Sequence, residues 1–287
     1  MAALSPTAKA IIMVCLAALC YTLNDTMTKL LIDRYDVTVI IFVRSLLALL
    51  LLMVMAVVIG RDRVRWSPQM PFHALRGAIN LLAAYLYING LRYLTVAEAT
   101  IIVFAAPFMV TLGAIVIFQE RVDWRKWAAV LVSFAGVAIA IQPGTDTFQP
   151  ASLLILASAF LYAVNSLTSR WIPAGDNLWT VSFMGAACAA LFIAPFTVGR
   201  WSAFHAGDVA LFAGAALSSS FGVGLGTLAY RSVPASELTP YGYSGLIWSI
   251  AAAWIVWGSV PGLWTVAGAL VIASSSIFHF MSRRNDG

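Results

Sequence analysis

Charged residues are scarce in this chain, which has 17 Lys and Arg and 12 Asp and Glu among its 287 residues, or 10%. A soluble domain carries about 25% charged residues, so most of the surface is predicted to face lipid instead of water. Cysteine is also scarce, and Cys15, Cys20 and Cys188 all lie within apolar runs. Such cysteines are typical of a packed interior, so the sequence indicates no disulfide framework, no metal site and no cofactor.

Signals for nucleotide or nucleic-acid binding are missing as well. Gly222, Gly224 and Gly226 resemble a fragment of a phosphate-binding loop, but no Lys-Ser or Lys-Thr step follows them, and close helix packing explains them better. Because no Walker motif occurs, ATP is not expected to drive this chain directly. The net charge of +5 does not indicate nucleic acid, because the basic residues form short clusters between apolar runs.

Apolar residues are abundant, at 61% of the chain with a mean hydropathy of +0.90. A helix needs about 20 of them to span a bilayer, and only helices satisfy their own backbone in lipid. Such runs predict ten transmembrane helices: 9–31, 37–60, 71–91, 95–118, 127–142, 150–171, 178–199, 207–229, 235–257 and 262–281. The distribution of Lys and Arg between the runs predicts a multi-pass protein of the cell inner membrane with both termini cytoplasmic.

The two halves of the chain resemble each other at a nearly constant offset. Residues 21–29 match residues 162–170, with Tyr and Asn identical at two positions. The matches indicate a duplication, with one repeat at 1–145 and the other at 146–287. Because each repeat holds five helices, an odd number, the repeats are predicted to be inverted in the membrane. The predicted fold is an all-α transmembrane bundle of ten helices, and inverted repeats are typical of carriers with a central site.

Several segments carry a resemblance to a known family. Phe118-Gln119-Glu120-Arg121 follows the fourth run, and a small-residue segment with Ala135-Gly136-Val137 comes after it. In the second half, Gly258-Ser259-Val260 stands in place of the acidic-basic step. With its ten predicted spans, the chain resembles the EamA branch of the drug/metabolite transporter superfamily, most of all the YddG-type exporters of aromatic and other amino acids. The resemblance implies a secondary transporter.

Asp25 is a carboxylate deep within the first predicted span, where it needs a partner or water. The first hairpin turns near Arg34, so Arg44 on the second run lies at a similar depth, and Lys29 lies one helical turn from Asp25. We therefore predict an intramembrane charge group of Asp25, Arg44 and Lys29. This group either forms a structural ion pair or takes part in transport. In transport it would couple protons or bind a substrate carboxylate. Arg76, in the third run, is expected to extend to the membrane interface.

Polar and aromatic side chains inside the predicted spans are candidates for a substrate cavity. Amides at membrane depth hydrogen-bond a helix, water or a ligand, and aromatic rings stack on amphipathic or aromatic solutes. The candidates are Tyr21, Asn24, Asn80, Tyr85, Tyr162, Asn165, Tyr241, Tyr243, Ser244 and Trp248. For each of them, packing against lipid or a neighbouring helix is the alternative.

The leading functional prediction is export of amino acids, including aromatic ones, and related small metabolites by alternating access around a central cavity. Efflux of cationic or aromatic drugs is a second prediction, although the midspan acid Asp25 is expected to be neutralised by Arg44. The Gly-x-Ser-Gly motif at 242–245 suggests a third, an intramembrane serine protease, but every histidine lies near a span end. We expect a monomeric, non-enzymatic protein whose partners are the lipid bilayer and small solutes such as amino acids.

Overall fold

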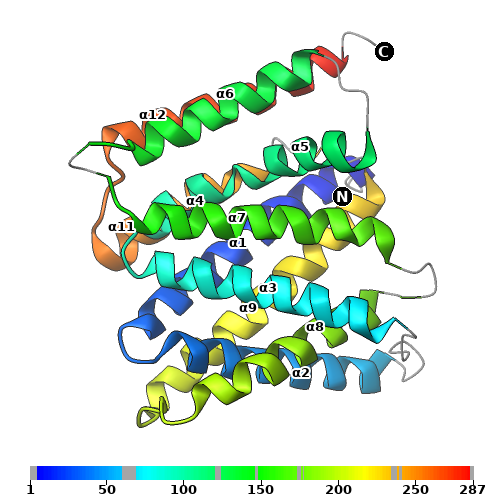
Figure 1. The fold of residues 1–287 in the computed structure, drawn as a ribbon, viewed down its shortest axis with the longest axis vertical. Helices are drawn as coiled ribbons and strands as arrows, with labels where there is room; N and C mark the ends of the chain where they lie inside the picture. The colour runs from blue at the N-terminus through cyan, green and yellow to red at the C-terminus, as the bar shows by residue number, and fades with distance from the viewer. Residues whose placement is uncertain are drawn as a thin grey trace.

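The computed structural model describes residues 5–59, 69–119, 124–145, 148–172, 176, 178–233, 238 and 241–284. All regular secondary structure in these ranges is helical (Figure 1). The α-helices are α1 Pro6–Ile32, α2 Val37–Ile59, α3 Met70–Leu91, α4 Val96–Val103, α5 Ala106–Phe118, α6 Trp124–Ile141, α7 Ala151–Thr168, α8 Leu178–Ile193, α9 Ala206–Ser232, α11 Ser244–Trp257 and α12 Leu263–Arg284. Two short 3-10 helices, η2 Ser169–Trp171 and η3 Ala194–Thr197, extend α7 and α8. These bounds follow the predicted apolar runs closely.

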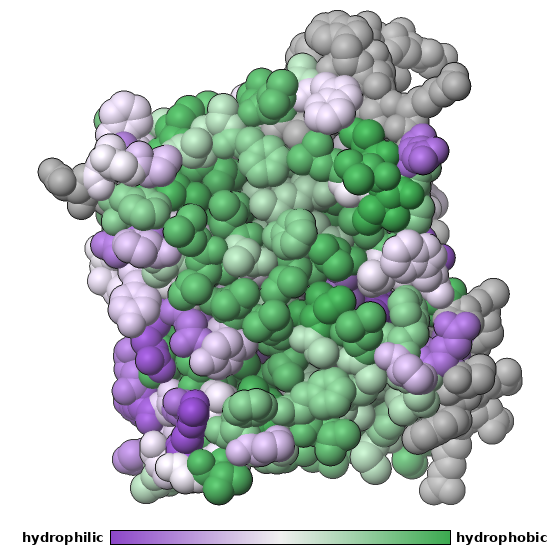
Figure 2. Space-filling model, viewed as in Figure 1, coloured by the Kyte–Doolittle hydropathy of each residue, from purple (hydrophilic) through white to green (hydrophobic). Residues whose placement is uncertain are grey.

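The helices have the length and surface of membrane spans. Six segments are long and apolar enough to cross a membrane: Pro6–Ile32, Val37–Val54, Val96–Phe118, Ala151–Trp171, Thr180–Thr197 and Ala206–Ala229. α3 is not among them because it carries His73, Arg76 and Asn80. The face in Figure 2 is hydrophobic across its middle, with hydrophilic side chains gathered mainly along its left edge. The chain is therefore a multi-pass membrane protein, as predicted.

The main helix contacts join the first half of the chain to the second. α1 packs against α9, α3 against α7, α2 against α8, and α6 against α12. This pattern is unchanged when the halves are exchanged, since α1 corresponds to α7 and α3 to α9. α1 begins and α12 ends at the same end of the bundle, opposite the α1–α2 turn (Figure 1). The contacts agree with a duplication, and the inverted relation of the halves stays a prediction.

The predicted spans 95–118 and 235–257 are interrupted, which the apolar runs did not predict. In the first, Pro107 has no N–H to donate to the carbonyl of Val103, so the helix breaks at Phe104 and Ala105. In the second, the described helix α11 begins only after Tyr243. The two breaks meet, because the rings of Phe104 and Tyr243 lie 4.8 Å apart. Corresponding positions of the two halves are therefore in contact.

Glycine allows α6 and α12 to pack with their backbones in contact. A Cβ atom on Gly268 would lie 2.5 Å from the carbonyl oxygen of Gly136 and 2.7 Å from the Cβ of Ala140. Real Cβ atoms do not approach backbone that closely, so any side chain here would force the helices apart. Close packing of small residues is a main source of helix association in lipid.

A group of polar residues ties the halves together at the end of the bundle that carries the α1–α2 turn, here called the α1–α2 end. Arg34 Nη1 donates to Asp208 Oδ1 at 2.6 Å, and the Tyr35 hydroxyl donates to Asp208 Oδ2 at 2.9 Å. His205 Nδ1 lies 3.8 Å from the same carboxylate. Asp208 is only 2% exposed, whereas Arg34 is 58% exposed. The buried acid at the start of α9 therefore holds the α1–α2 turn of the other half.

A second link lies beside this one. Arg200 Nη1 is 3.6 Å from Asp36 Oδ1, and the Thr38 hydroxyl donates both to Asp36 Oδ1 and to the carbonyl of Phe196. Partial burial acts to raise the pKa of Asp36. The hydrogen bonds from Thr38 and the charge of Arg200 outweigh this effect and hold that pKa below its ordinary value. The carboxylate form of Asp36 is thus favoured in the folded protein.

Beneath these links, buried apolar side chains fill the α1–α2 end. We call them the end cluster; its buried members are Leu31, Ile32, Tyr35, Val37, Ile40, Ile41, Tyr87, Ile88, Leu91, Leu94, Val96, Ala99, Ile102, Ala151, Ile155, Ile193 and Phe212. They come from α1, α2, α3, α4, α7, α8 and α9 and the adjoining turns. The end cluster closes the bundle at this end.

The α6–α12 packing predicts the effect of one methyl group. Gly268→Ala is expected to destabilise the protein by about 1–3 kcal/mol, the usual cost of overpacking a tight contact. Gly224→Ala is the matched control, because a Cβ on this helical glycine of α9 meets nothing within 4 Å. The comparison is made by thermal unfolding in detergent. Equal melting temperatures for the two variants would contradict this account of the α6–α12 contact.

The Asp208 link predicts a second stability effect. Asp208→Ala leaves the buried Tyr35 hydroxyl without its acceptor and is expected to cost about 1–3 kcal/mol. Asp33→Ala changes an exposed acid of the same α1–α2 turn and serves as the control. Thermal unfolding in detergent measures both variants. A loss in Asp208→Ala no larger than in Asp33→Ala would mean that the link contributes no stability.

Candidate functional site

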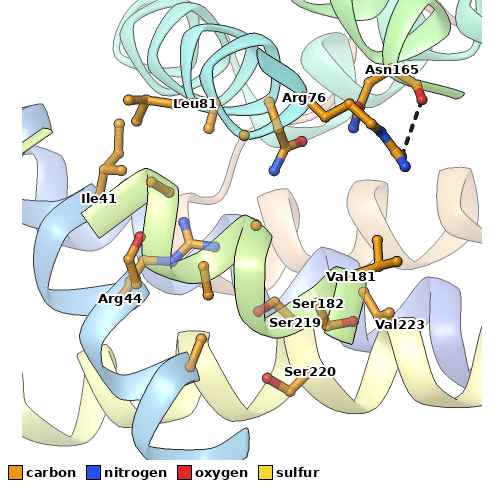
Figure 3. Close-up of a pocket in the computed structure, with 18 of the residues that line it drawn as sticks. Ile41, Arg44, Arg76, Leu81, Asn165, Val181, Ser182, Ser219, Ser220 and Val223 are labelled. Carbon is orange, nitrogen blue, oxygen red and sulfur yellow. Dashed lines mark hydrogen bonds between the residues drawn. The ribbon is translucent and has the colours of Figure 1, made fainter. Parts of the chain in front are cut away.

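A cavity of about 500 Å³ lies between helices of both halves. Its walls come from α2 and α3 of the first half and from α7, α8 and α9 of the second. It extends from Ile41 and Ile88, which also belong to the end cluster, towards His73 and Val181 near the opposite end of the bundle. Polar side chains project into it from several directions (Figure 3), and those other than arginine and histidine are Ser45, Asn80, Asn165, Ser182, Ser219 and Ser220.

Arg44 of α2 lies on one wall of the cavity and is fixed by α1. Its Nη1 donates to the hydroxyl of Thr28 at 3.0 Å, and its Nη2 donates to Oδ1 of Asn24 at 2.6 Å. The remaining guanidinium nitrogen, Nε, is buried without a hydrogen-bond partner in the described structure. Arg44 is thus held in one orientation on the wall of the cavity.

Asp25 lies behind Arg44, and an amide separates the two charges. Asn24 Nδ2 donates to Asp25 Oδ1 at 2.8 Å while its Oδ1 accepts from Arg44. The hydroxyl of Tyr87, on α3, donates to Asp25 Oδ2 at 2.7 Å. The predicted direct ion pair is therefore replaced by a bridged one, because the amide of Asn24 occupies the space between the carboxylate and the guanidinium. The side chain of Tyr162, on α7, is close enough to interact electrostatically with both charges.

Lys29 does not share Asp25, contrary to the prediction. Its Nζ donates to the backbone carbonyl of Leu91 at 2.7 Å and also to that of Leu94. These carbonyls lie at the end of α3 and in the turn after it, where the negative end of the helix dipole favours a cation. The ammonium also lies 5.8 Å from the centre of the Trp257 ring. Lys29 therefore fastens α1 to the α3–α4 turn.

Arg76 turns into the protein, and the prediction that it extends to the membrane interface is wrong. Its Nε donates to Oδ1 of Asn165 at 3.3 Å and its Nη2 to the backbone carbonyl of Asn165 at 3.4 Å (Figure 3). Its Nη1 is buried and has no hydrogen-bond partner among the described residues. The reason is local: α3 packs against α7 and α8, so this face of α3 meets protein instead of lipid.

The fixed charges on the cavity wall are positive. Arg44 and Arg76 lie on α2 and α3, and the residues described as lining the cavity include no Asp or Glu. His73 also lines it, but its Nε2 lies 2.8 Å from Oδ2 of Asp176, so that imidazole is engaged by a carboxylate of the α7–α8 segment. The wall therefore offers hydrogen-bond donors and positive charge to a solute.

Two of the ten predicted cavity residues, Asn80 and Asn165, line this cavity, and Asn24 lies one hydrogen bond behind it. The other seven do not line it. The ring of Tyr21 packs on α9, where a Cβ on Gly222 would meet it at 3.0 Å. Tyr85 packs against the end cluster, and Tyr162 lies near Asp25. The four remaining candidates, Tyr241, Tyr243, Ser244 and Trp248, lie in or just before α11.

The sequence did not lead us to predict that serines line the cavity or that Arg76 lies on its wall. The run of serines at 218–220, inside an apolar segment, was a usable signal for Ser219 and Ser220. A second signal was Gly185, which occupies the position of Arg44 in the other repeat. A Cβ on Gly185 would meet nothing within 4 Å, so the missing side chain leaves open space in the wall of the cavity.

The serine of the Gly-x-Ser-Gly motif lacks the partner that a protease needs. Ser244 Oγ is buried with no hydrogen-bond partner in the described residues. His73 and His205 lie on other helices, next to Asp176 and Asp208, and the side chain of His279 is outside the described residues. A nucleophilic serine requires a base within hydrogen-bond reach. The described geometry gives no support to the protease alternative.

Curated relatives of the chain are transporters with different solutes. The S-adenosylmethionine uptake transporter of Rickettsia prowazekii is 26% identical over 264 residues, which cover 92% of this chain and 89% of the relative. The riboflavin transporter of Rhizobium johnstonii is 29% identical over 216 residues, covering 72% and 68%. The pseudopaline exporter of Pseudomonas aeruginosa is 23% identical over 282 residues, covering 93% and 94%. These solutes do not single out amino acids, so the narrower YddG-type assignment is not supported.

A solved structure with a similar fold and a family model both agree with the transporter relatives. A crystal structure of another protein matches with a TM-score of 0.68 over 97% of this chain and 99% of that chain, at 16% sequence identity. At this identity the match shows the fold alone. The model of the EamA-like transporter family matches the chain twice, over residues 8–142 and 149–281. Together the two matches cover nearly all of the sequence, and the chain belongs to the EamA-like transporter family.

Proposed function

We propose that this chain is a secondary transporter that exports amino acids and related small metabolites by alternating access around the cavity between its two halves. The single observation that carries this proposal is the cavity itself, which both halves build from hydrogen-bonding side chains. Its volume of about 500 Å³ falls within the range of about 300–1,000 Å³ that is usual for small-molecule sites. A solute site between repeats is also the arrangement that alternating access requires.

The cavity is closed at the α1–α2 end. The end cluster and the Asp208 link seal the α1–α2 end. With both termini in the cytoplasm, as the distribution of Lys and Arg favours, the α1–α2 end faces away from the cytoplasm. Under this proposal the structure represents a state that receives solute from the cytoplasm. Export then requires the α1–α2 end to separate while the opposite end closes.

The polar groups of the cavity suit an amino acid better than a cationic drug. Arg44 and Arg76 can bind a carboxylate, while the carbonyl groups of Asn80 and Asn165 and the serine hydroxyls can accept from an ammonium group. A cationic drug would need a carboxylate on the wall, which the described lining does not provide. S-adenosylmethionine, which relatives carry, contains an amino-acid group but also a sulfonium cation, so the positive wall favours it less than an amino acid.

Counterflow in proteoliposomes tests the proposal. Vesicles loaded with an unlabelled amino acid or with S-adenosylmethionine should take up the same labelled compound faster than empty vesicles. The reason is that an alternating-access carrier exchanges solute without net transport. Riboflavin and a cationic drug complete the panel. If no amino acid or amino-acid derivative exchanges in folded, inserted protein, the proposed function is wrong.

Filling the cavity should block this exchange without unfolding the protein. Gly185→Trp places an indole in the open space of the cavity wall, since a Cβ at this position meets no atom within 4 Å. We expect counterflow to fall at least about tenfold, because the side chain occupies much of a site of this size. Gly224→Trp on α9 is the matched control, as its Cβ also meets nothing and it is not a lining residue. Equal counterflow in both variants would place the transport path elsewhere.

A further inference from the structure

We infer that the cavity selects solutes with a net negative charge, and that Arg76 is the residue that sets this preference. This inference rests on the proposed function, because it names the charge class of the solute that the same cavity transports. It goes further in separating three kinds of amino-acid-like solute, namely anions, zwitterions and cations. The argument depends on how each charged group around the cavity is neutralised.

Arg44 already has a counter-charge. Its guanidinium is linked through the amide of Asn24 to the carboxylate of Asp25, by hydrogen bonds of 2.6 and 2.8 Å. The hydroxyls of Thr28 and Tyr87 complete this group. One positive and one negative charge therefore cancel on this side of the cavity. Arg44 therefore adds no net charge to the cavity wall.

Arg76 has no such counter-charge. The hydrogen bonds of its guanidinium in the structure go to the side chain and backbone of Asn165, both neutral. Its Nη1 has no partner among the described residues. The carboxylate of Asp176 lies 2.8 Å from His73, on the same helix as Arg76, and is engaged there. Among the described groups that line or back the cavity, Arg76 is the cation without an acid.

Arg76 therefore places one positive charge on the cavity wall that no acid contact among the described residues compensates. An uncompensated charge at membrane depth is unfavourable, and the interaction between two charges strengthens as water is excluded. A carboxylate solute without an ammonium group supplies the missing negative charge. A zwitterion binds its carboxylate there but brings a positive charge with it, and a cationic solute only adds positive charge beside Arg76. The preferred order is therefore anion, zwitterion, cation.

Two series of amino-acid derivatives test this order while the side chain of the solute stays constant. At pH 7, N-acetylmethionine is an anion, methionine is a zwitterion, and methionine methyl ester carries a positive charge in its protonated form. The phenylalanine series has the same three members. The measurement is the rise in melting temperature of the detergent-solubilised full chain with increasing solute, because a ligand that binds the folded state stabilises it. This readout does not depend on transport.

In the wild type, we expect the N-acetyl anion of at least one series to bind about tenfold or more tightly than its methyl ester, with the parent amino acid between them. Arg76→Gln, which keeps hydrogen-bonding capacity and removes the charge, should abolish the order. Arg76→Lys, which restores a positive charge, should recover it. Arg92→Gln is the control, because Arg92 is exposed at the end of α3 and does not line the cavity.

The outcomes separate this inference from the proposed function. Equal or reversed binding of anion and ester in both series overturns the inference, as does no binding of any member. An unchanged order in Arg76→Gln overturns the role of Arg76. If the order holds but none of the compounds exchanges in proteoliposomes, the inference stands and the proposed function fails. If amino acids exchange without any preference for charge, the proposed function stands and the inference fails.

Discussion

A charge inside a bilayer is tolerated only where the protein itself compensates it, and this constraint shapes the first half of the chain. Asp25 on α1 and Arg44 on α2 are joined through Asn24, and Tyr87 on α3 completes the acid's hydrogen bonds. One buried carboxylate thereby connects three helices. It also fixes the orientation of Arg44, so a group that satisfies a folding requirement also forms part of the cavity wall. Stability and solute recognition depend here on the same atoms.

The predicted duplication accounts for both the framework and the position of the cavity. Helix contacts recur when the halves are exchanged, as in α1–α9 and α3–α7, and the broken spans meet at Phe104 and Tyr243. The charges do not follow this symmetry. The position of Arg44 is occupied in the second half by Gly185, which leaves open space. One half has a large side chain at this position and the other half has none. This sequence difference between the halves contributes to the cavity.

Helix positions could be predicted from the sequence, whereas the site could be predicted only in part. Lipid requires long apolar helices, so runs such as 37–60 correspond closely to observed helices. Which face of a helix meets protein depends on its neighbours, and local sequence does not contain that information. Arg76 was therefore expected at the interface and lies in the cavity, and Lys29 was assigned to Asp25 but binds backbone carbonyls. Asn165, the predicted repeat mate of Asn24, lines the cavity, and its role in binding a solute stays a prediction.

The central claim is that solute reaches this cavity from the side opposite the α1–α2 end. Site-directed labelling tests it most directly, with Ser219→Cys in a chain whose three native cysteines are replaced by serine. Ser219 lines the cavity without belonging to the end cluster. The account predicts that a membrane-impermeant maleimide reacts from the cytoplasmic face and that a transported solute slows the reaction. Reaction only from the opposite face, or at a rate that no transported solute changes, would contradict it.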